Sequence, residues 1–309
     1  MRCLRLLALI SLICVGGAAS AFADSGGAAG PDVYVGGDFG LLKNGVRQSG
    51  YGCVRSIFVS GNDVYAAGWE NNAEGVRVAR LWKNGAGQNL GDGKYESQAN
   101  SVFVSGNDVY VAGWERGAQG VTVARFWKNG AANVIQDELS ANAVFVSGND
   151  LYLGGSFGLM KNGVRQDGYF WVSSVFVSGD EVHATGFDGW ETNHWRNGRS
   201  RAIAGTDASA ESVFVSGRNV YLAGWSENGG RDRFAKIWEN GRMRNITDGK
   251  REARAYSVFA SGNDVYVAGW EHNEEGIKTA RLWKNGVDQN IGVEGVAYSV
   301  YVVSVSNQN

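Results

Sequence analysis

Short stretches rich in apolar and aromatic residues, separated by Gly, Asn and Asp, recur along almost the whole chain. One unit contains four such stretches, at 101–105, 109–114, 121–128 and 131–135. Such stretches predict β-strands, and apolar residues can point both ways along a strand that neighbouring sheets cover on both faces. Ser-Gly-Asn-Asp links the first strand to the second, and Asn-Gly links the third to the fourth, so both links are tight turns. The unit is therefore predicted to be a four-stranded antiparallel meander.

This unit repeats. Residues 102–115 return almost unchanged at 258–271. An Asn-Gly pair follows the third strand in each of seven units, with spacings of 33 to 45 residues, at Asn44, Asn84, Asn129, Asn162, Asn197, Asn240 and Asn285. A four-stranded repeat of this length predicts the blade of a β-propeller.

The two ends of the chain complement each other. The first unit begins at its second strand, Asp32-Val33-Tyr34, with no first strand before it. The segment 297–304 matches the first strand of the preceding unit, 255–261, and has no partner strands after it. We therefore expect the C-terminal strand to complete the N-terminal blade, which removes the open sheet edges that invite aggregation. The predicted fold is an all-β, seven-bladed propeller.

The stretch 106–113, Gly-Asn-Asp-Val-Tyr-Val-Ala-Gly, resembles the Gly-Asn-x-Tyr-Val-x-Gly core of bacterial seven-bladed propeller repeats. The order of strands is also similar to kelch repeats, although the Gly-Gly pair typical of kelch ends the second strand only at Gly36-Gly37 and Gly154-Gly155. The resemblance covers nearly all of 32–309. It implies a fold and not an activity.

The first 23 residues have the pattern of a secretory signal peptide. Arg2 and Arg5 precede an apolar run at 6–15, and Ala21-Phe22-Ala23 offers small residues at a cleavage site. The apolar run is too short to span a membrane. We expect 1–23 to be removed, 24–31 to be a flexible lead-in, 32–309 to form one propeller domain, and the protein to be periplasmic or extracellular.

Charge and composition remove several classes of function. The net charge is −2 and no basic block stands out, which argues against nucleic-acid binding. The three histidines, at 183, 194 and 272, fall in different contexts and no His/Cys group has zinc spacing. No calcium loop, nucleophile elbow or phosphate loop is present. The sequence predicts a monomer without metal or cofactor, and not an enzyme.

Loop lengths suggest a ligand groove. The links between second and third strands are long in units 2, 3, 6 and 7 and short in units 1, 4 and 5. The variable loops share one face of a propeller, where binding residues concentrate. A low path from unit 1 to units 4 and 5 is expected to hold an extended peptide or glycan, lined by Asp38, Phe39, Ser156, Phe157, Phe187, Asp188 and Trp190.

A Trp-Glu pair recurs in three units, as Trp69-Glu70, Trp114-Glu115 and Trp270-Glu271. An aromatic ring beside a carboxylate could hold a sugar, and the repetition would make such a lectin multivalent. The other interpretation, which we favour, is a packing Trp with an ion pair. Units with the long link also carry a cation on the third strand, at Arg80, Arg125, Lys236 and Arg281.

The sequence thus predicts a secreted, non-enzymatic binding scaffold with a protein or peptide ligand on the variable-loop face. A carbohydrate-binding lectin is the alternative. A glycan-acting hydrolase or lyase comes third, because no particular pair of carboxylates can be assigned from the sequence.

Overall fold

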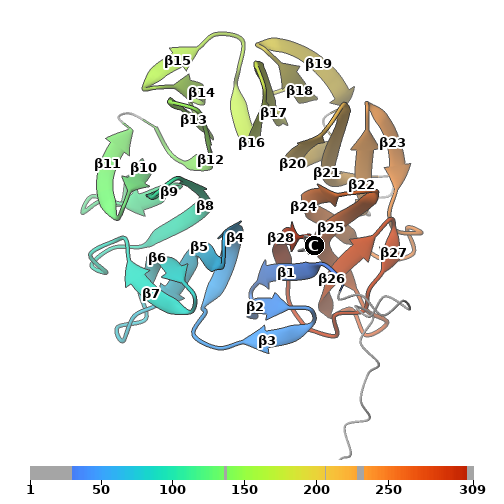
Figure 1. The fold of residues 1–309 in the computed structure, drawn as a ribbon, viewed down its shortest axis with the longest axis horizontal. Coiled ribbons are helices and arrows are strands. Elements are labelled where there is room, and N and C mark those ends of the chain that lie inside the picture. Colours follow the sequence, from blue (N-terminus) through green and yellow to red (C-terminus); the bar gives the residue numbers. More distant parts are fainter. Residues whose placement is uncertain (1–29, 136–137, 206, 228–232, 305–309) are drawn as a thin grey trace, which may run out of the picture.

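Seven four-stranded antiparallel sheets surround a central axis in the computed structural model, which describes residues 30–135, 138–205, 207–227 and 233–304 (Figure 1). Each sheet is one blade, and its first strand lies nearest the axis (Figure 1). We name the strands of a blade A to D from the axis outward. The predicted seven-bladed β-propeller is confirmed.

Blade 1 contains β28 (Ala297–Val303), β1 (Asp32–Gly37), β2 (Gly40–Lys43) and β3 (Val46–Gln48). Blade 2 contains β4 (Cys53–Ser60), β5 (Asp63–Asn71), β6 (Arg77–Lys83) and β7 (Ala86–Asn89). Blade 3 contains β8 (Ser97–Ser105), β9 (Asp108–Arg116), β10 (Thr122–Lys128) and β11 (Ala131–Ile135). Blades 4 and 5 contain β12 (Ala141–Ser147), β13 (Asp150–Gly155), β14 (Gly158–Lys161) and β15 (Val164–Gln166); β16 (Trp171–Ser178), β17 (Glu181–Phe187), β18 (Thr192–Arg196) and β19 (Arg199–Ala204). Blades 6 and 7 contain β20 (Ala208–Ser216), β21 (Asn219–Glu227), β22 (Arg233–Glu239) and β23 (Arg242–Asn245); β24 (Ala253–Ser261), β25 (Asp264–His272), β26 (Lys278–Lys284) and β27 (Val287–Asp288).

The C-terminal strand closes the ring. β28 pairs antiparallel with β1, from Asp32 opposite Val303 to Gly37 opposite Ala297. The last described strand thus supplies strand A of the blade whose other three strands come first in the chain (Figure 1). The predicted closure is confirmed.

The C–D turns follow directly from their sequence. All seven Asn-Gly pairs have positive φ at both positions, 49–53° at Asn and 78–84° at Gly, as a type I′ turn requires. Each Asn side chain also accepts a hydrogen bond from a backbone N–H near the start of strand B of the same blade, at 2.8–3.0 Å. This contact ties the turn to the neighbouring strand.

Aromatic side chains of the A strands form a closed ring around the axis. Neighbouring ring centroids lie 4.5–5.6 Å apart in the order Phe58, Phe103, Phe145, Phe176, Phe214, Phe259, Tyr301 and back to Phe58. Tilted contacts at this spacing are favourable. The ring joins all seven blades at the centre of the molecule, as expected for residues that repeat in every unit.

The expected signal peptide and most of the expected lead-in lie outside the described residues. Within the part of the chain that the structure describes, no helix is long and apolar enough to cross a membrane.

Candidate functional site

The A strand of blade 3 begins earlier than the sequence pattern predicted, and every A strand contains a β-bulge near its start. Strand β8 begins at Ser97 rather than at residue 101, and the pairing with β9 skips Asn100. The same register shift occurs in every blade and leaves one residue per A strand outside the ladder. In order around the axis these residues are Tyr298, Arg55, Asn100, Asn142, Ser173, Glu211 and Tyr256. A bulge re-aims a side chain, and bulges are common beside active sites.

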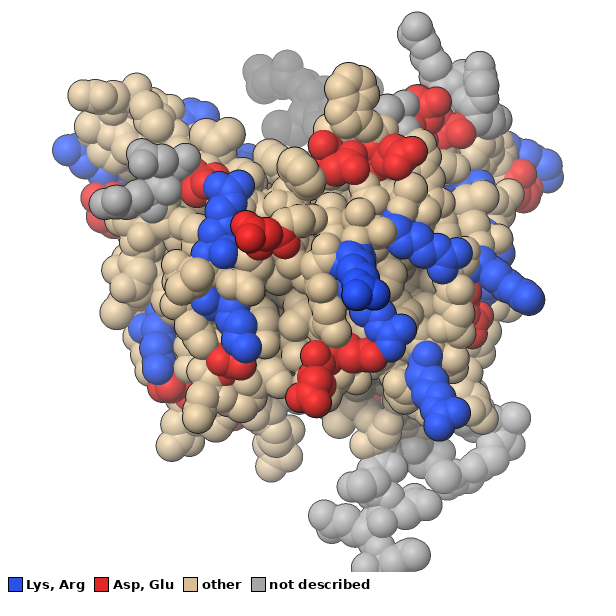
Figure 2. Space-filling model, turned by 90° about the horizontal axis from the view of Figure 1, so that it is seen from above, with Lys and Arg blue, Asp and Glu red and all other residues tan. Residues whose placement is uncertain are grey.

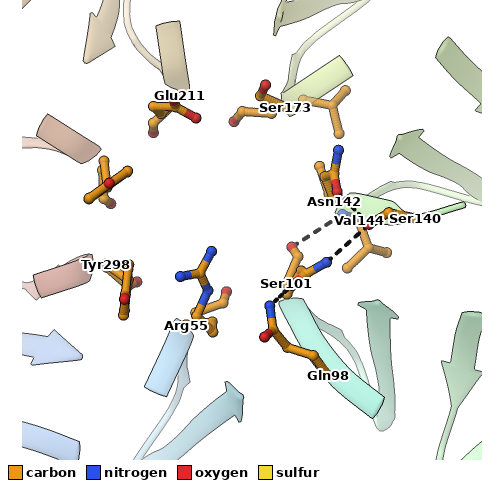
Figure 3. A pocket seen from close by; sticks show the side chains of 18 of the residues that line it. Arg55, Gln98, Ser101, Ser140, Asn142, Val144, Ser173, Glu211 and Tyr298 are labelled. Carbon is orange, nitrogen blue, oxygen red and sulfur yellow. Dashed lines mark hydrogen bonds between the residues drawn. The ribbon is translucent and has the colours of Figure 1, made fainter. Parts of the chain in front are cut away.

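All seven bulge residues line one pocket on the axis, with a volume of about 440 Å³ (Figure 3). All seven are half-buried. The pocket opens on the face where the variable loops meet, because the bulges lie at the start of each A strand. We call it the axial pocket. The residue type at the bulge position varies among the blades, although the surrounding strand pattern repeats.

Two opposite charges face each other across the axial pocket, Arg55 from β4 and Glu211 from β20 (Figure 3). The Arg55 guanidinium lies 4.0 Å from the centre of the Tyr298 ring. Glu211 accepts a hydrogen bond from Trp225 Nε1 at 3.2 Å. Among the described residues neither Arg55 nor Glu211 forms an ion pair. Both charges therefore remain available to a ligand.

The charges divide the wall of the axial pocket into two arcs. Tyr256 and Tyr298 form an aromatic arc, and burial raises the pKa of both phenols, so they stay protonated donors at neutral pH. The other arc consists of Asn100, Asn142 and Ser173, of which Figure 3 labels Asn142 and Ser173.

Hydrogen bonds hold the amides of this second arc in place. Gln98 Nε2 donates to Asn100 Oδ1 at 2.7 Å, and Asn100 Nδ2 donates to the Ala141 carbonyl at 3.0 Å. Asn142 Nδ2 donates to the Val172 carbonyl at 3.1 Å. Each amide thus bridges to the next blade, and the arc is preorganised before any ligand arrives.

A ring of serines lies one residue beyond the bulges. Each hydroxyl accepts a hydrogen bond from a backbone N–H of the next blade, at 3.1–3.3 Å, and the set is Ser56, Ser101, Ser174, Ser212, Ser257 and Ser299. Blade 4 has Ala143 at this position. The serine ring fixes the spacing of the blades directly beneath the variable side chains.

The predicted groove is wrong in two of its residues. Phe39 is 5% exposed and Phe157 is fully buried, and both belong to cores between blades. In each of these two blades the short B–C link folds the phenyl ring back over the preceding Gly-Gly pair. A Cβ on Gly155 would lie 2.6 Å from the Phe157 ring, so glycine is required there. Neither phenylalanine can touch a ligand.

The remaining groove residues do not line the axial pocket. Asp38 accepts a hydrogen bond from the Val296 N–H, and Ser156 bonds the backbone at Ser140. Phe187 is half-buried, at the end of β17. Asp188 accepts bonds from the backbone of its own turn, while Trp190 is 78% exposed at the tip. Whether Trp190 binds a ligand stays a prediction.

The Trp-Glu pairs carry the ion pairs of the bracing interpretation. Arg80 lies 3.2 Å from Glu70, Arg125 lies 2.6 Å from Glu115, and Arg281 lies 3.3 Å from Glu271. Cations also cover two of the indoles, with Arg77 at 4.5 Å from the Trp69 ring and Lys278 at 4.6 Å from the Trp270 ring. Trp270 is 2% exposed and offers no platform to a sugar. Trp114 differs, because it lines the axial pocket.

Two histidines expected in separate contexts meet in blade 5. His183 Nδ1 and His194 Nε2 lie 3.0 Å apart and the rings stack. Burial, followed by the charges of His183, Arg201 and Arg196, lowers the pKa of His194 to about 4. The pair is therefore neutral at pH 7. Among the described residues no group of three or more His, Cys, Asp or Glu is placed to hold a metal ion.

Comparison with known proteins gives similarity in fold alone. No protein-family model matches the chain, and no curated protein matches it. Similar solved structures include the extracellular domain of a B. thetaiotaomicron protein, at 10% identity and TM-score 0.45, covering 80% of this chain and 38% of that one. The β-propeller domain of the Trilobed protease from Pyrococcus furiosus is 14% identical, with TM-score 0.43, covering 74% of this chain and 81% of that domain. The chain thus spans well under half of the first of these structures.

Proposed function

We propose that this protein is an exported, non-enzymatic binding protein that holds a peptide segment in the axial pocket. The observation that carries the proposal is the pair Arg55 and Glu211, which face one pocket from opposite sides without forming an ion pair with any described residue. A half-buried charge without a partner is costly unless a ligand or water compensates it. A peptide with a carboxylate and an ammonium group, or with side chains of both signs, would compensate both.

The composition of the pocket supports binding rather than catalysis. Acid–base hydrolysis of glycosides uses two carboxylates, and covalent catalysis uses a nucleophile beside a base. Among the described lining residues the only carboxylate is Glu211, and neither His nor Cys is present. The chemistry available is charge pairing, hydrogen bonding and contact with aromatic rings.

Export rests on the first 23 residues, whose charged start, apolar run and Ala-Phe-Ala end are typical of a signal peptide. Kelch-like repeats, as the sequence resemblance implies, would serve as the scaffold that presents the pocket. The bulge residues of the axial pocket would then set ligand specificity, because their residue types change from blade to blade. The serine ring beneath them is nearly the same in every blade.

A selection from a phage-displayed peptide library on the purified chain tests the proposal. We expect selected peptides to carry both charge signs and to lose about tenfold or more in affinity with Arg55→Gln or Glu211→Gln, since charge-assisted bonds are lost. Arg47→Gln is the matched control, because Arg47 is exposed on β3, outside the pocket. Selected peptides that bind all three variants equally would refute the peptide site.

A lectin is the second candidate, favoured by the aromatic arc of Tyr256 and Tyr298 with Trp114 and Trp171 in the same pocket. Sugars bind with a ring face on an aromatic side chain and with hydroxyls on amides. A glycan array separates the two functions. Binding of neutral glycans that depends on Tyr298 but not on Arg55 or Glu211 would replace the peptide proposal by the lectin.

A further inference from the structure

A second cavity, of about 330 Å³, lies at the seam between blades 5 and 6. Four arginines line it together with the His183–His194 pair: Arg196, Arg199, Arg201 and Arg218. We call it the arginine pocket. Arg196 and Arg199 flank a C–D turn and Arg218 lies in an A–B turn, so this pocket opens on the tight-turn face. The axial pocket opens on the opposite face.

The repeat itself shows how unusual this pocket is, because every blade has the same positions. The register places Arg201 where four other blades have glutamine, at Gln48, Gln88, Gln166 and Gln289. Arg199 stands where five blades have Val or Ala. Arg218 occupies a turn position that is Asn in four blades.

The two histidines depart from the repeat in the same place. His183 replaces the tyrosine that strand B carries in the six other blades. His194 replaces an apolar residue, which is Leu, Phe or Ile in all six. Five departures from the commonest residue thus gather in one cavity. Blade 6 shares two of them, with Arg242 and Arg244 at the positions of Arg199 and Arg201.

Protein groups balance only part of the charge in the arginine pocket. Glu181 pairs with Arg196, but no carboxylate lines the cavity among the described residues. In five other blades an Asp–Lys ion pair stands near the A–B turn, as in Lys83–Asp63 at 2.7 Å. Blade 6 has Asn219 in place of that Asp, beside Arg218 in the A–B turn, and Glu239 in place of that Lys. Clustered guanidinium groups repel one another until an anion arrives.

A buried imidazole of the arginine pocket has a carboxylate as a close neighbour. His183 is 1% exposed and lines the arginine pocket, and its Nε2 has no hydrogen-bond partner among the described residues. This Nε2 lies 3.4 Å from Glu181 Oε2, within the range of an ion pair if the imidazole is protonated. Figure 2 looks onto this edge of the ring and shows Lys and Arg side chains interspersed with Asp and Glu. All four arginines of the pocket are exposed. The charge is thus open to solvent.

From this geometry we infer that the arginine pocket binds a phosphate or sulfate group. Guanidinium groups recognise such tetrahedral oxyanions through paired N–H donors, and several of them share the multiple charge. A carboxylate would satisfy fewer donors. The site is independent of the axial pocket, and its occupation does not depend on what that pocket binds.

Calorimetric titration of the whole purified chain with inorganic phosphate, inorganic sulfate and glucose 6-phosphate tests this inference. Chloride and glucose at matched ionic strength serve as blanks. We expect binding of the oxyanions, with movement of the His183 and His194 imidazole signals in NMR spectra. Tighter binding of the sugar phosphate than of inorganic phosphate would identify an ester on a larger molecule as the ligand; equal binding would identify the free ion.

The variant Arg201→Gln with Arg218→Asn restores residues that the other blades already carry, so the fold is expected to persist. It should weaken phosphate binding by about tenfold or more, since two charged hydrogen-bonding groups are removed. Arg47→Gln should leave the affinity unchanged. Equal affinity in the double variant and the control, or a response no larger than that to chloride, would overturn the inference.

Discussion

A single hydroxyl separates Ala143 from the serine that stands at the same position in the other six blades. Six serines each bond a backbone N–H of the next blade, but Ala143 offers Val175 no such acceptor. The seam between blades 4 and 5 is therefore one hydrogen bond short at the axis. A backbone N–H without a partner is a cost that most buried groups avoid.

We predict that Ala143→Ser raises the free energy of unfolding by about 0.5–1.5 kcal/mol, the net worth of one intramolecular hydrogen bond. Urea denaturation followed by tryptophan fluorescence measures the change. Ser101→Ala removes the equivalent bond to Val144 and should have the opposite sign. A variant at Ala143 that is no more stable than the parent would mean that water already satisfies Val175.

Residue-level reasoning from the sequence missed the axial pocket for a physical reason. Arg55 and Glu211 occupy the one variable position between a small apolar residue and the repeated serine. A regular strand would have sent these side chains between blades, and the bulge turns them to the axis instead. The signal was present as a variable position inside an otherwise constant strand. The direction in which these side chains point could be known only from the register of the strands.

Loop length and the nature of the aromatic residue are coupled at the scale of strands. The short B–C links of blades 1 and 4 carry Gly-Gly followed by a phenylalanine that turns inward, as at Phe157. The long hairpins carry Gly-Trp, and in blades 2, 6 and 7 a cation lies over the indole, as at Trp69. The sequence pattern located these hairpins correctly, but it could not show that the shorter ones seal the core. The inward turn depends on space left by two glycines, which is a packing property.

We predict that Gly155→Ala lowers the free energy of unfolding by about 1–3 kcal/mol, the usual cost of overpacking. The new Cβ would lie 2.2 Å from the Ser140 carbonyl oxygen and 2.6 Å from the Phe157 ring. Gly117→Ala is the control, because its Cβ would meet nothing nearer than 3.6 Å. Thermal unfolding measured by circular dichroism distinguishes the two. Equal midpoints would show that Phe157 moves aside freely.

The ring as a whole depends on one strand that joins the two ends of the chain. Repeats of four strands, seven Asn-Gly turns and complementary ends were sufficient to predict this closure from sequence. No sequence pattern indicated the arginine pocket, because its residues come from two blades and only the contact between those blades brings His183 near Arg218. Sequence repeats reveal what blades share, whereas a site between blades depends on where each departs.

We predict that a chain ending at Val296 loses its monomeric fold. Without β28, strand β1 loses its partner on one side and the core cluster loses the β28 side chains that pack in it. An open sheet edge of this kind pairs with other chains. Size-exclusion chromatography with light scattering should show oligomers or aggregate, and a synthetic peptide of residues 297–304 should restore the monomer. A chain ending at Ser304 is the control. A stable monomer without β28 would show that six complete blades hold the ring.

The pairing of β28 with β1 leaves Val303 opposite Asp32. In the next blade the corresponding pair, Ser60 and Asp63, is joined through Gly61 and Asn62. A short Gly-Asn bridge would thus turn this polypeptide into a continuous loop, and a cut at any other A–B turn would then yield a circular permutant with the same seven blades. The architecture has no intrinsic first blade, so the order in which its units are translated is free to change without altering the shape they build.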